Sequence, residues 1–295
     1  MRQMTMFAQR VCWMLGGAFF AGAFAFTVLA TSPAALAFTF TTIDVPGATL
    51  TNAIGINAHG QIVGAFTDAG GAFHGFLLDG GSFTAVDPPG ATGGTEAGGI
   101  NELGQIVGEF IDASGQHGFL LDKGSFNTID VPGATATLAD TINIRGQIVG
   151  FYDDVSGTTH GFLLDEGIFA TIDVPGATLT HAFGINAHGQ IVGGFADAGG
   201  AFHGFLLDGG TFTTIDVPGA TFSAAFGINN RGQISGFYVD GSGTEHGFLL
   251  DKGIFATIDV PGAMSTSALA MNARGQIVGA FTDAGGAFHG FVATP

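Results

Sequence analysis

Short apolar runs alternate with turn residues along most of the chain, and this pattern repeats every 43 residues. The segment Ile-Asp-Val-Pro-Gly-Ala marks the period. Counted by its first residue, it occurs at Ile43, Val86 (as Val-Asp-Pro-Pro-Gly-Ala), Ile129, Ile172, Ile215 and Ile258. The triplet His-Gly-Phe keeps the same step, at His74, His117, His160, His203, His246 and His289. Six copies of one unit therefore fill residues 38–295.

Each copy contains four apolar runs with the length and composition of β-strands. In the first copy these are run a (40–44), run b (52–56), run c (61–66) and run d (74–78). Run a ends in Asp-Val-Pro-Gly, and Pro-Gly is typical of the centre of a type II turn. The pattern predicts an all-β chain, as do the plentiful glycines and β-branched residues.

The links between the runs predict how the strands pair. Asn-x-x-Gly stands between b and c, as in 57–60, and fits a type I turn with its glycine in the left-handed region. Asp-Gly-Gly or a similar tripeptide joins d to the next run a, as in 79–81. A longer loop, such as 67–73, joins c to d. Runs b, c, d and a therefore form one antiparallel meander, and the chain passes to the next unit between a and b.

Repeats of 40 to 50 residues with four strands each are typical of a β-propeller. The repeated part begins with run a and ends just after run d, so the first run a can complete the sixth sheet. We therefore predict a six-bladed propeller of four-stranded blades, closed by this N-terminal strand, with run b innermost. The rival is an open solenoid, which requires atypical capping repeats that neither end shows.

The first 37 residues differ from the rest. Arg2 and Arg10 precede an apolar stretch that ends in Ala35-Leu36-Ala37, which is the pattern of a secretory signal peptide. We expect cleavage after Ala37, with an uncleaved membrane anchor as the alternative. The domains are then 1–37, the signal peptide, and 38–295, the propeller. The expected location is extracellular, with the periplasm as the alternative compartment, and Cys12, the one cysteine, would be lost.

Charge narrows the set of partners. The chain carries −17, and loss of Arg2 and Arg10 leaves five basic and 24 acidic side chains, a net charge of −19. Phosphate contacts need Lys and Arg, so a nucleic-acid partner is not expected. After cleavage no membrane contact is expected either. The expected protein is a monomer that binds an unknown protein or carbohydrate.

The motif Gly-Ile-Asn-x-x-Gly-Gln-Ile-Val-Gly, followed by His-Gly-Phe-Leu, resembles the HAF family of extracellular repeat proteins. It reads GINAHGQIVG and HGFLLD at 55–64 and 74–79 and recurs in all six copies. The family triplet is usually His-Ala-Phe, whereas this chain has His-Gly-Phe throughout. The resemblance implies a secreted bacterial repeat protein of poorly defined function and supplies no catalytic residue.

The repeated polar residues have structural interpretations beside functional ones. The six His of His-Gly-Phe are expected to bond loop backbone rather than a metal, because a ring separates them. The Asp of Ile-Asp-Val-Pro-Gly is expected to cap the following turn. Asp112, Asp153, Asp154 and Asp240 lie in c–d loops with Gly and Ser. Turn formation is the preferred role there, with calcium, the one cofactor considered, as the alternative.

Positions at which the copies differ are the better candidates for a ligand site. Near the start of run b stand Asn52, Glu96, Asp140 and His181, which we expect near one mouth of the channel if run b lines the axis. Glu96, Asp140 and His181 form the acid–base mixture of the chain. Drift at solvated positions is the competing interpretation. No nucleophile elbow, phosphate loop or zinc motif occurs.

The sequence favours an exported, non-catalytic module for binding or surface interaction. One alternative is a propeller hydrolase or lyase with its site at the channel mouth, assisted by calcium. The other is a purely structural matrix component. The near identity of copies one, four and six indicates recent duplication, which favours the two non-enzymatic functions.

Overall fold

The computed structural model describes residues 38–295. The predicted signal peptide, its cleavage site and the alternative anchor lie outside the described residues. Within 38–295 no helix has the length and apolar character needed to cross a membrane.

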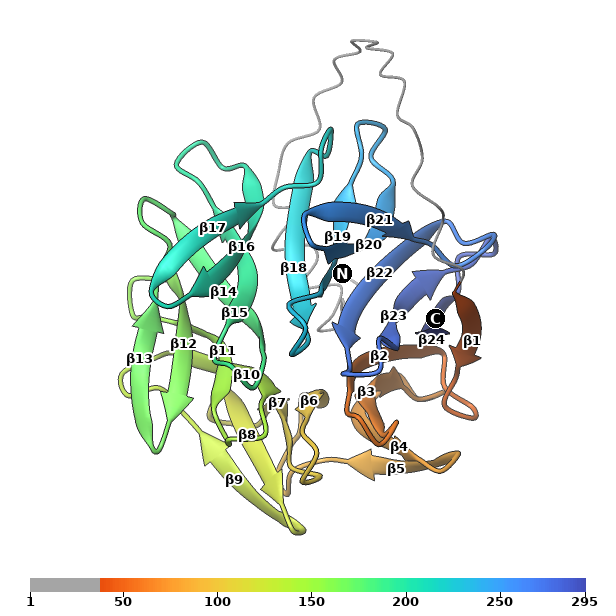
Figure 1. The fold of residues 1–295 in the computed structure, drawn as a ribbon. Helices are drawn as coiled ribbons and strands as arrows, with labels where there is room; N and C mark the ends of the chain where they lie inside the picture. Colours follow the sequence, from red (N-terminus) through yellow and green to blue (C-terminus); the bar gives the residue numbers. More distant parts are fainter. Residues whose placement is uncertain (1–37) are drawn as a thin grey trace. The chain divides into compact units, whose positions relative to one another are not determined.

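The described residues form twenty-four strands, which pair as six blades of four (Figure 1). Blades 1 to 3 are β2 (Leu50–Ile56), β3 (Ile62–Thr67), β4 (Phe73–Asp79), β5 (Ser82–Val86); β6 (Gly94–Ile100), β7 (Ile106–Ile111), β8 (Gln116–Asp122), β9 (Ser125–Ile129); and β10 (Ala136–Ile142), β11 (Ile148–Asp153), β12 (Thr159–Asp165), β13 (Ile168–Ile172). Blades 4 to 6 are β14 (Leu179–Ile185), β15 (Ile191–Ala196), β16 (Phe202–Asp208), β17 (Thr211–Ile215); β18 (Phe222–Ile228), β19 (Ile234–Val239), β20 (Glu245–Asp251), β21 (Ile254–Ile258); and β22 (Ser265–Met271), β23 (Ile277–Thr282), β24 (Phe288–Thr294), β1 (Thr39–Ile43).

Every blade is an antiparallel meander in chain order, except that blade 6 takes its fourth strand from the beginning of the repeated region. β1 pairs with β24 from Thr39 opposite Thr294 to Ile43 opposite Gly290. Blades 2 and 3 are also joined by a single parallel pair, Ala136 with Gln116. The predicted meander and the predicted closing strand are both confirmed.

The first strand of each blade contacts the first strand of the next blade, and β22 contacts β2. The six first strands therefore form a closed ring around the axis, and the fold is a six-bladed β-propeller. This arrangement excludes the open solenoid, in which the two end units would not meet.

Turn chemistry explains why the strands end where they do. Gly47 follows Pro46 with φ of +81°, and the N–H of Ala48 bonds the Val45 carbonyl, as in a type II turn. The hairpins that join first to second strands, here called the inner hairpins, have Gly60 and its equivalents at positive φ. The hairpins that join third to fourth strands, the outer hairpins, have two consecutive residues at positive φ, such as Gly80 and Gly81.

Both kinds of hairpin lie at one end of the blades, which we call the hairpin face. The longer loops between second and third strands and the Pro-Gly links between blades lie at the other end, the loop face.

The core lies between neighbouring blades. Phe76 and its equivalent in every blade are fully buried: Phe119, Phe162, Phe205, Phe248 and Phe291. One cluster joins Ile56 and Phe76 of blade 1 to Ile43 and Val278 of blade 6. The glycine of His-Gly-Phe permits this close packing: a Cβ on Gly118 would lie 3.0 Å from the Ile129 carbonyl oxygen and 3.3 Å from the Ala139 Cβ.

Candidate functional site

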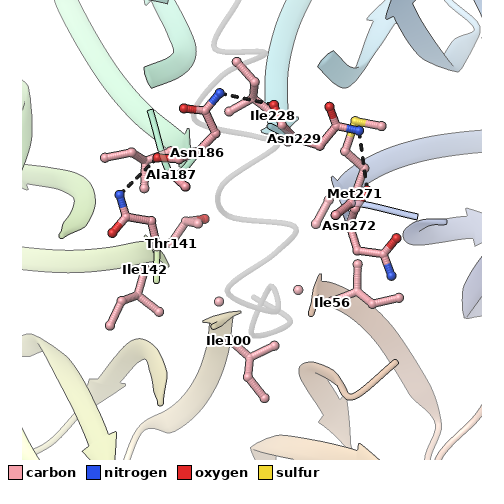
Figure 2. A pocket seen from close by; sticks show the side chains of 18 of the residues that line it. Ile56, Ile100, Thr141, Ile142, Asn186, Ala187, Ile228, Asn229, Met271 and Asn272 are labelled. Atoms are coloured by element: carbon pink, nitrogen blue, oxygen red, sulfur yellow. Dashed lines mark hydrogen bonds between the residues drawn. The ribbon is translucent and has the colours of Figure 1, made fainter. Parts of the chain in front are cut away.

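A cavity of about 330 Å³ lies on the axis at the hairpin face (Figure 2). Its wall comes from the ends of all six first strands and from the inner hairpins that follow them. Much of this wall is backbone, because small residues such as Gly55, Gly99, Gly184 and Gly227 stand where the strands approach the axis. A Cβ on Gly55 would lie 2.7 Å from the Gly98 carbonyl oxygen on the next strand.

A ring of asparagines fixes the shape of this cavity. The Nδ2 atom of each hairpin asparagine donates to the backbone carbonyl of the next one at 3.0–3.4 Å, and Asn272 donates to Asn57 to complete the circle. Nδ2 also donates to the Gln side chain four residues on, such as Gln61, while Oδ1 accepts the N–H groups of His59 and Gln61. The asparagine amides already make hydrogen bonds within the protein. A ligand in the cavity would therefore contact the residues of the inner hairpins around its mouth.

The four residues expected at a channel mouth lie on four consecutive first strands, β2, β6, β10 and β14. All four side chains are buried: Asn52 is 0 % exposed, Glu96 1 %, Asp140 6 % and His181 8 %. None of the four lines the cavity at the hairpin face. The structure therefore places them inside the channel wall. Asn52, Glu96 and His181 lie in the loop-face half of their strands, whereas Asp140 directly precedes Thr141, which lines the cavity.

Glu109 belongs to this group and was missed from the sequence. It lies directly opposite Glu96 in the register of β6 and β7, and its side chain is 1 % exposed. The equivalent positions carry Ala65, Phe151, Gly194, Phe237 and Ala280. The sequence did contain a signal for Glu109, because it is the one acidic residue at a repeat position that otherwise holds small or aromatic residues.

Aromatic rings also lie in the blades around the channel. The His181 ring lies 4.3 Å from the ring of Phe151, and Phe183 stacks on Phe226 at 4.2 Å and 9°. Glu245 contacts the Ser267 hydroxyl, and burial raises the pKa of Glu245. Buried carboxylates thus lie in blades 2, 3 and 5, and these aromatic rings lie in blades 3 to 5.

On the loop face every blade presents the same polar group, here called the Asp-His-Asp group. In blade 1, Nδ1 of His74 lies 2.9 Å from Asp87 of the Pro-Gly link, and its Nε2 lies 3.7 Å from Asp68 of the loop. The other five groups are centred on His117, His160, His203, His246 and His289. The last pairs with Asp44, so it spans the ring closure.

This arrangement corrects two predictions. The six histidines bond carboxylates rather than loop backbone. The aspartates of Ile-Asp-Val-Pro-Gly bind these histidines, and the turn is held by another residue: Oγ1 of Thr51 accepts the Val45 N–H at 3.1 Å. In blade 2 the residue after Asp87 is Pro88, which has no N–H to donate.

Hydrogen bonds and charges in the Asp-His-Asp groups shift several pKa values. Burial lowers the pKa of His246, but the bonds and charges of Asp259 and Asp240 outweigh it and raise the pKa overall. His289 shows the same balance with Asp44 and Asp283. The hydroxyl of Ser156 lowers the pKa of Asp154 to about 2, and Ser242 does the same for Asp240.

The calcium candidates take part in their own turns. Asp112 accepts the N–H and hydroxyl of Ser114, and Asp154 and Asp240 make the equivalent bonds to Ser156 and Ser242. Asp153 accepts the Thr159 hydroxyl at 2.6 Å. Among residues 38–295 no group of three or more His, Cys, Asp or Glu side chains is arranged to hold a metal ion.

No protein-family model matches the chain, and no curated protein sequence matches it. Several solved structures share its fold. AofleA from Arthrobotrys oligospora aligns with a TM-score of 0.57 at 13 % identity, over 86 % of each chain. The lectin of Aleuria aurantia, described as a six-bladed β-propeller with a novel mode of fucose recognition, aligns at 0.51 and 14 %, over 85 % of this chain and 93 % of the lectin.

A gluconolactonase, XC5397 from Xanthomonas campestris, aligns at 0.50 and 13 % identity, over 84 % of this chain and 88 % of that one. Identities this low show the shared fold alone. The chain is thus a six-bladed β-propeller of the architecture that both lectins and an enzyme use.

Proposed function

We propose that the protein is an exported, non-catalytic module that binds carbohydrate at six equivalent sites on its loop face, as a HAF-type extracellular repeat protein. The observation that carries this proposal is the Asp-His-Asp group, which recurs in every blade with the same partners. Six copies of one exposed polar group suit repeated binding better than catalysis, which needs one converging site.

The chemistry of each group suits a sugar. Side chains of the link aspartates are 33–51 % exposed, and those of the histidines 19–32 %. Carboxylates accept hydrogen bonds from hydroxyl groups, and an exposed carboxylate loses little hydration until a ligand replaces the water. An aromatic ring packs on each histidine at 5.1–5.4 Å, which holds the imidazole in place.

Repetition itself would supply the affinity. A single shallow sugar site binds weakly, but several sites on one rigid face can engage a polysaccharide or a cell surface together. The fungal lectin of Aleuria aurantia, which shares the fold and is described by its fucose recognition, supports a carbohydrate ligand in preference to a protein.

The test is a neutral glycan array followed by calorimetric titration of the best ligand. We expect a stoichiometry near six for a monosaccharide, halved by the triple variant Asp87→Asn/Asp173→Asn/Asp259→Asn, which alters alternate blades. The matched control is Asp79→Asn/Asp165→Asn/Asp251→Asn, which removes the same charge from the outer hairpins. Equal binding by the two triple variants would rule out the loop-face sites. If the protein bound no glycan, the proposal would fail and a structural matrix component would be the better interpretation.

A catalytic alternative rests on a different observation, the buried pair Glu96 and Glu109 with Asp140 and His181 in the same channel wall. The gluconolactonase of the same fold supports it. Turnover of a lactone or glycoside panel that is lost in Glu96→Gln would favour the enzyme. Thermal unfolding with millimolar calcium and with EDTA tests for a metal. A calcium-dependent rise of several degrees in melting temperature would favour this catalytic alternative.

A further inference from the structure

The basic residues of the described chain all lie on the hairpin face. Arg145, Arg231 and Arg274 stand in inner hairpins, and Lys123 and Lys252 stand in outer hairpins. Most of the acidic residues lie at the loop face or in the channel wall. A protein this acidic therefore concentrates its cations at the end that holds the axial cavity.

Five consecutive inner hairpins carry a basic or titratable residue at the same position. Going round the ring from blade 3, this basic arc consists of Arg145, His188, Arg231, Arg274 and His59. All five are exposed. Blade 2 breaks the arc with Leu103, and the preceding Glu102 lines the cavity.

The arc is fixed at the mouth of the cavity. Four of its members directly follow cavity-lining residues, namely Ile144, Ala187, Asn230 and Ala273. In addition, Oδ1 of the hairpin asparagine accepts the backbone N–H of each arc residue at 2.9–3.0 Å. Because the asparagine ring holds the backbone of the arc residues, only their side chains lose rotational freedom when a ligand binds. This lowers the entropic cost of binding.

The outer hairpins carry more acidic than basic side chains, although Lys123 and Lys252 stand there, and so disfavour an anion. In four blades an outer-hairpin aspartate accepts a hydrogen bond from the Nε2 group of a glutamine, as Asp79 does from Gln61 at 2.9 Å. The same glutamine also bonds the hairpin asparagine. An anionic ligand is repelled by this outer circle and attracted by the arc within it.

We propose that the basic arc binds the carboxylates of a uronic-acid saccharide, with one sugar ring seated in the axial cavity. Three guanidinium groups offer paired donors that match carboxylate geometry. The cavity of about 330 Å³ is at the small end of ligand pockets and suits a terminal sugar rather than a chain that passes through. This site lies at the opposite face from the Asp-His-Asp groups and does not rest on glycan binding there.

Calorimetry of the protein with trigalacturonate provides the first test, with the fully methyl-esterified trimer as the neutral probe. We expect the acid to bind, the ester to lose the binding, and added salt to weaken it. A sulfated trisaccharide bound as tightly as the uronate would reassign the ligand to sulfate esters. Equal binding of acid and ester, or binding of neither, overturns the site.

Variants locate the binding. Arg145→Gln/Arg231→Gln/Arg274→Gln should weaken trigalacturonate binding by about tenfold or more, since even one charge-assisted bond is worth that much. Lys123→Gln/Lys252→Gln is the matched control on the same face and should change it by about twofold or less. An equal loss in both variants would point to the general field of the face and refute the arc.

The substitution Leu103→Arg provides a gain-of-function test that does not depend on the triple variant folding. It completes the arc at blade 2 and should tighten uronate binding several-fold. Unchanged or weaker binding by Leu103→Arg, with an unchanged melting temperature, would contradict the proposal.

Discussion

At the scale of the residue, strain is concentrated in the outer hairpins. Lys123, Glu166 and Lys252 adopt φ of +49° to +50° at a position where blades 1 and 4 have Gly80 and Gly209. A side chain at positive φ costs about 1–2 kcal/mol, part of which is offset because glycine makes the unfolded chain more flexible. The same turn is thus formed with glycine in two blades and with a Lys or Glu side chain at positive φ in three others.

We therefore expect Lys252→Gly to raise the free energy of unfolding by about 0.5 kcal/mol, measured by urea denaturation. The reverse change Gly209→Lys should lower it by a similar amount and serves as the internal control. A Lys252→Gly protein less stable than the parent would show that the strain is relieved in a way that the backbone angle does not reveal.

The Asp-His-Asp groups predict a window of maximal stability. The pKa values of Asp154 and Asp240 are lowered to about 2 in the folded protein, so their contribution is present above the ordinary value of 3.8 and lost as pH falls towards 2. The pKa values of His246 and His289 are raised above 6.5, so their contribution is complete below 6.5 and lost as pH rises through the folded values.

Melting temperatures should therefore be highest between about pH 4 and pH 6.5. The variant His246→Gln/His289→Gln should show a smaller fall between pH 5.5 and pH 8 than the parent. A melting temperature that rises over that interval would contradict the assigned direction of the histidine pKa shifts.

Residue-level prediction from the sequence succeeded where the backbone decides and failed where side-chain direction does. Pro-Gly and Asn-x-x-Gly specify their turns locally, and both formed as expected. Asp140 is itself the extra residue of a β-bulge in β10, between Ala139 and Thr141, and Ile54 holds the same place in β2. Alternation cannot reveal that extra residue, so the sequence could not say which residues lie in the wall and which reach the mouth.

At the scale of the element, the predicted runs match the strands within two residues at each end. The run predicted at 52–56 is β2, Leu50–Ile56, and that at 74–78 is β4, Phe73–Asp79. Turn residues at both ends of each run set these limits. The Asp-His-Asp groups were not foreseen. Five of them pair a strand histidine with a link aspartate thirteen residues further on, and the sixth pairs His289 with Asp44 at the other end of the repeated region.

The second strand of every blade has a glycine that the first strand covers closely. A Cβ on Gly150 would overlap the Leu138 carbonyl oxygen, and the equivalent glycines in the other five blades meet the same obstacle. Because the obstacle is backbone, the two strands must separate to admit a methyl group.

We expect Gly150→Ala to lower the free energy of unfolding by more than about 2 kcal/mol, as overpacking against backbone does. Gly241→Ala is the control, since a Cβ there meets nothing within 4 Å and φ is not positive. Denaturant unfolding of both proteins measures the difference. A Gly150→Ala protein as stable as Gly241→Ala would mean that β10 and β11 are not held at this separation.

At the scale of the whole molecule, closure depends on one strand. β1 alone completes blade 6, and the His289–Asp44 pair and the Asn272–Asn57 bond cross the same seam. The sequence predicted this closure from the order of runs at the two ends, because a propeller stabilises its last blade by joining the ends of the chain. Its strength could not be predicted, since the side-chain bonds across the seam depend on the closed geometry.

A disulfide across the seam measures how much the ring gains from closure. Thr41 and Val292 are register partners in β1 and β24, and the corresponding pair within blade 1 is Thr84 and Leu77. The variant Thr41→Cys/Val292→Cys closes a loop of nearly the whole propeller, whereas Leu77→Cys/Thr84→Cys closes only the outer hairpin. In the chain-entropy description the longer loop should add about 3 kcal/mol more to the free energy of unfolding.

Urea denaturation of each oxidised protein against its reduced form isolates this difference, because both bonds occupy the same place in a blade. Reduction also cancels the effect of the cysteine substitutions themselves. If the two cysteines introduced across the seam fail to join under oxidising conditions that join the control pair, β1 is not seated in blade 6. Equal stabilisation by the two bonds would contradict this expectation, because the long closed loop would then constrain the unfolded chain no more than the short one.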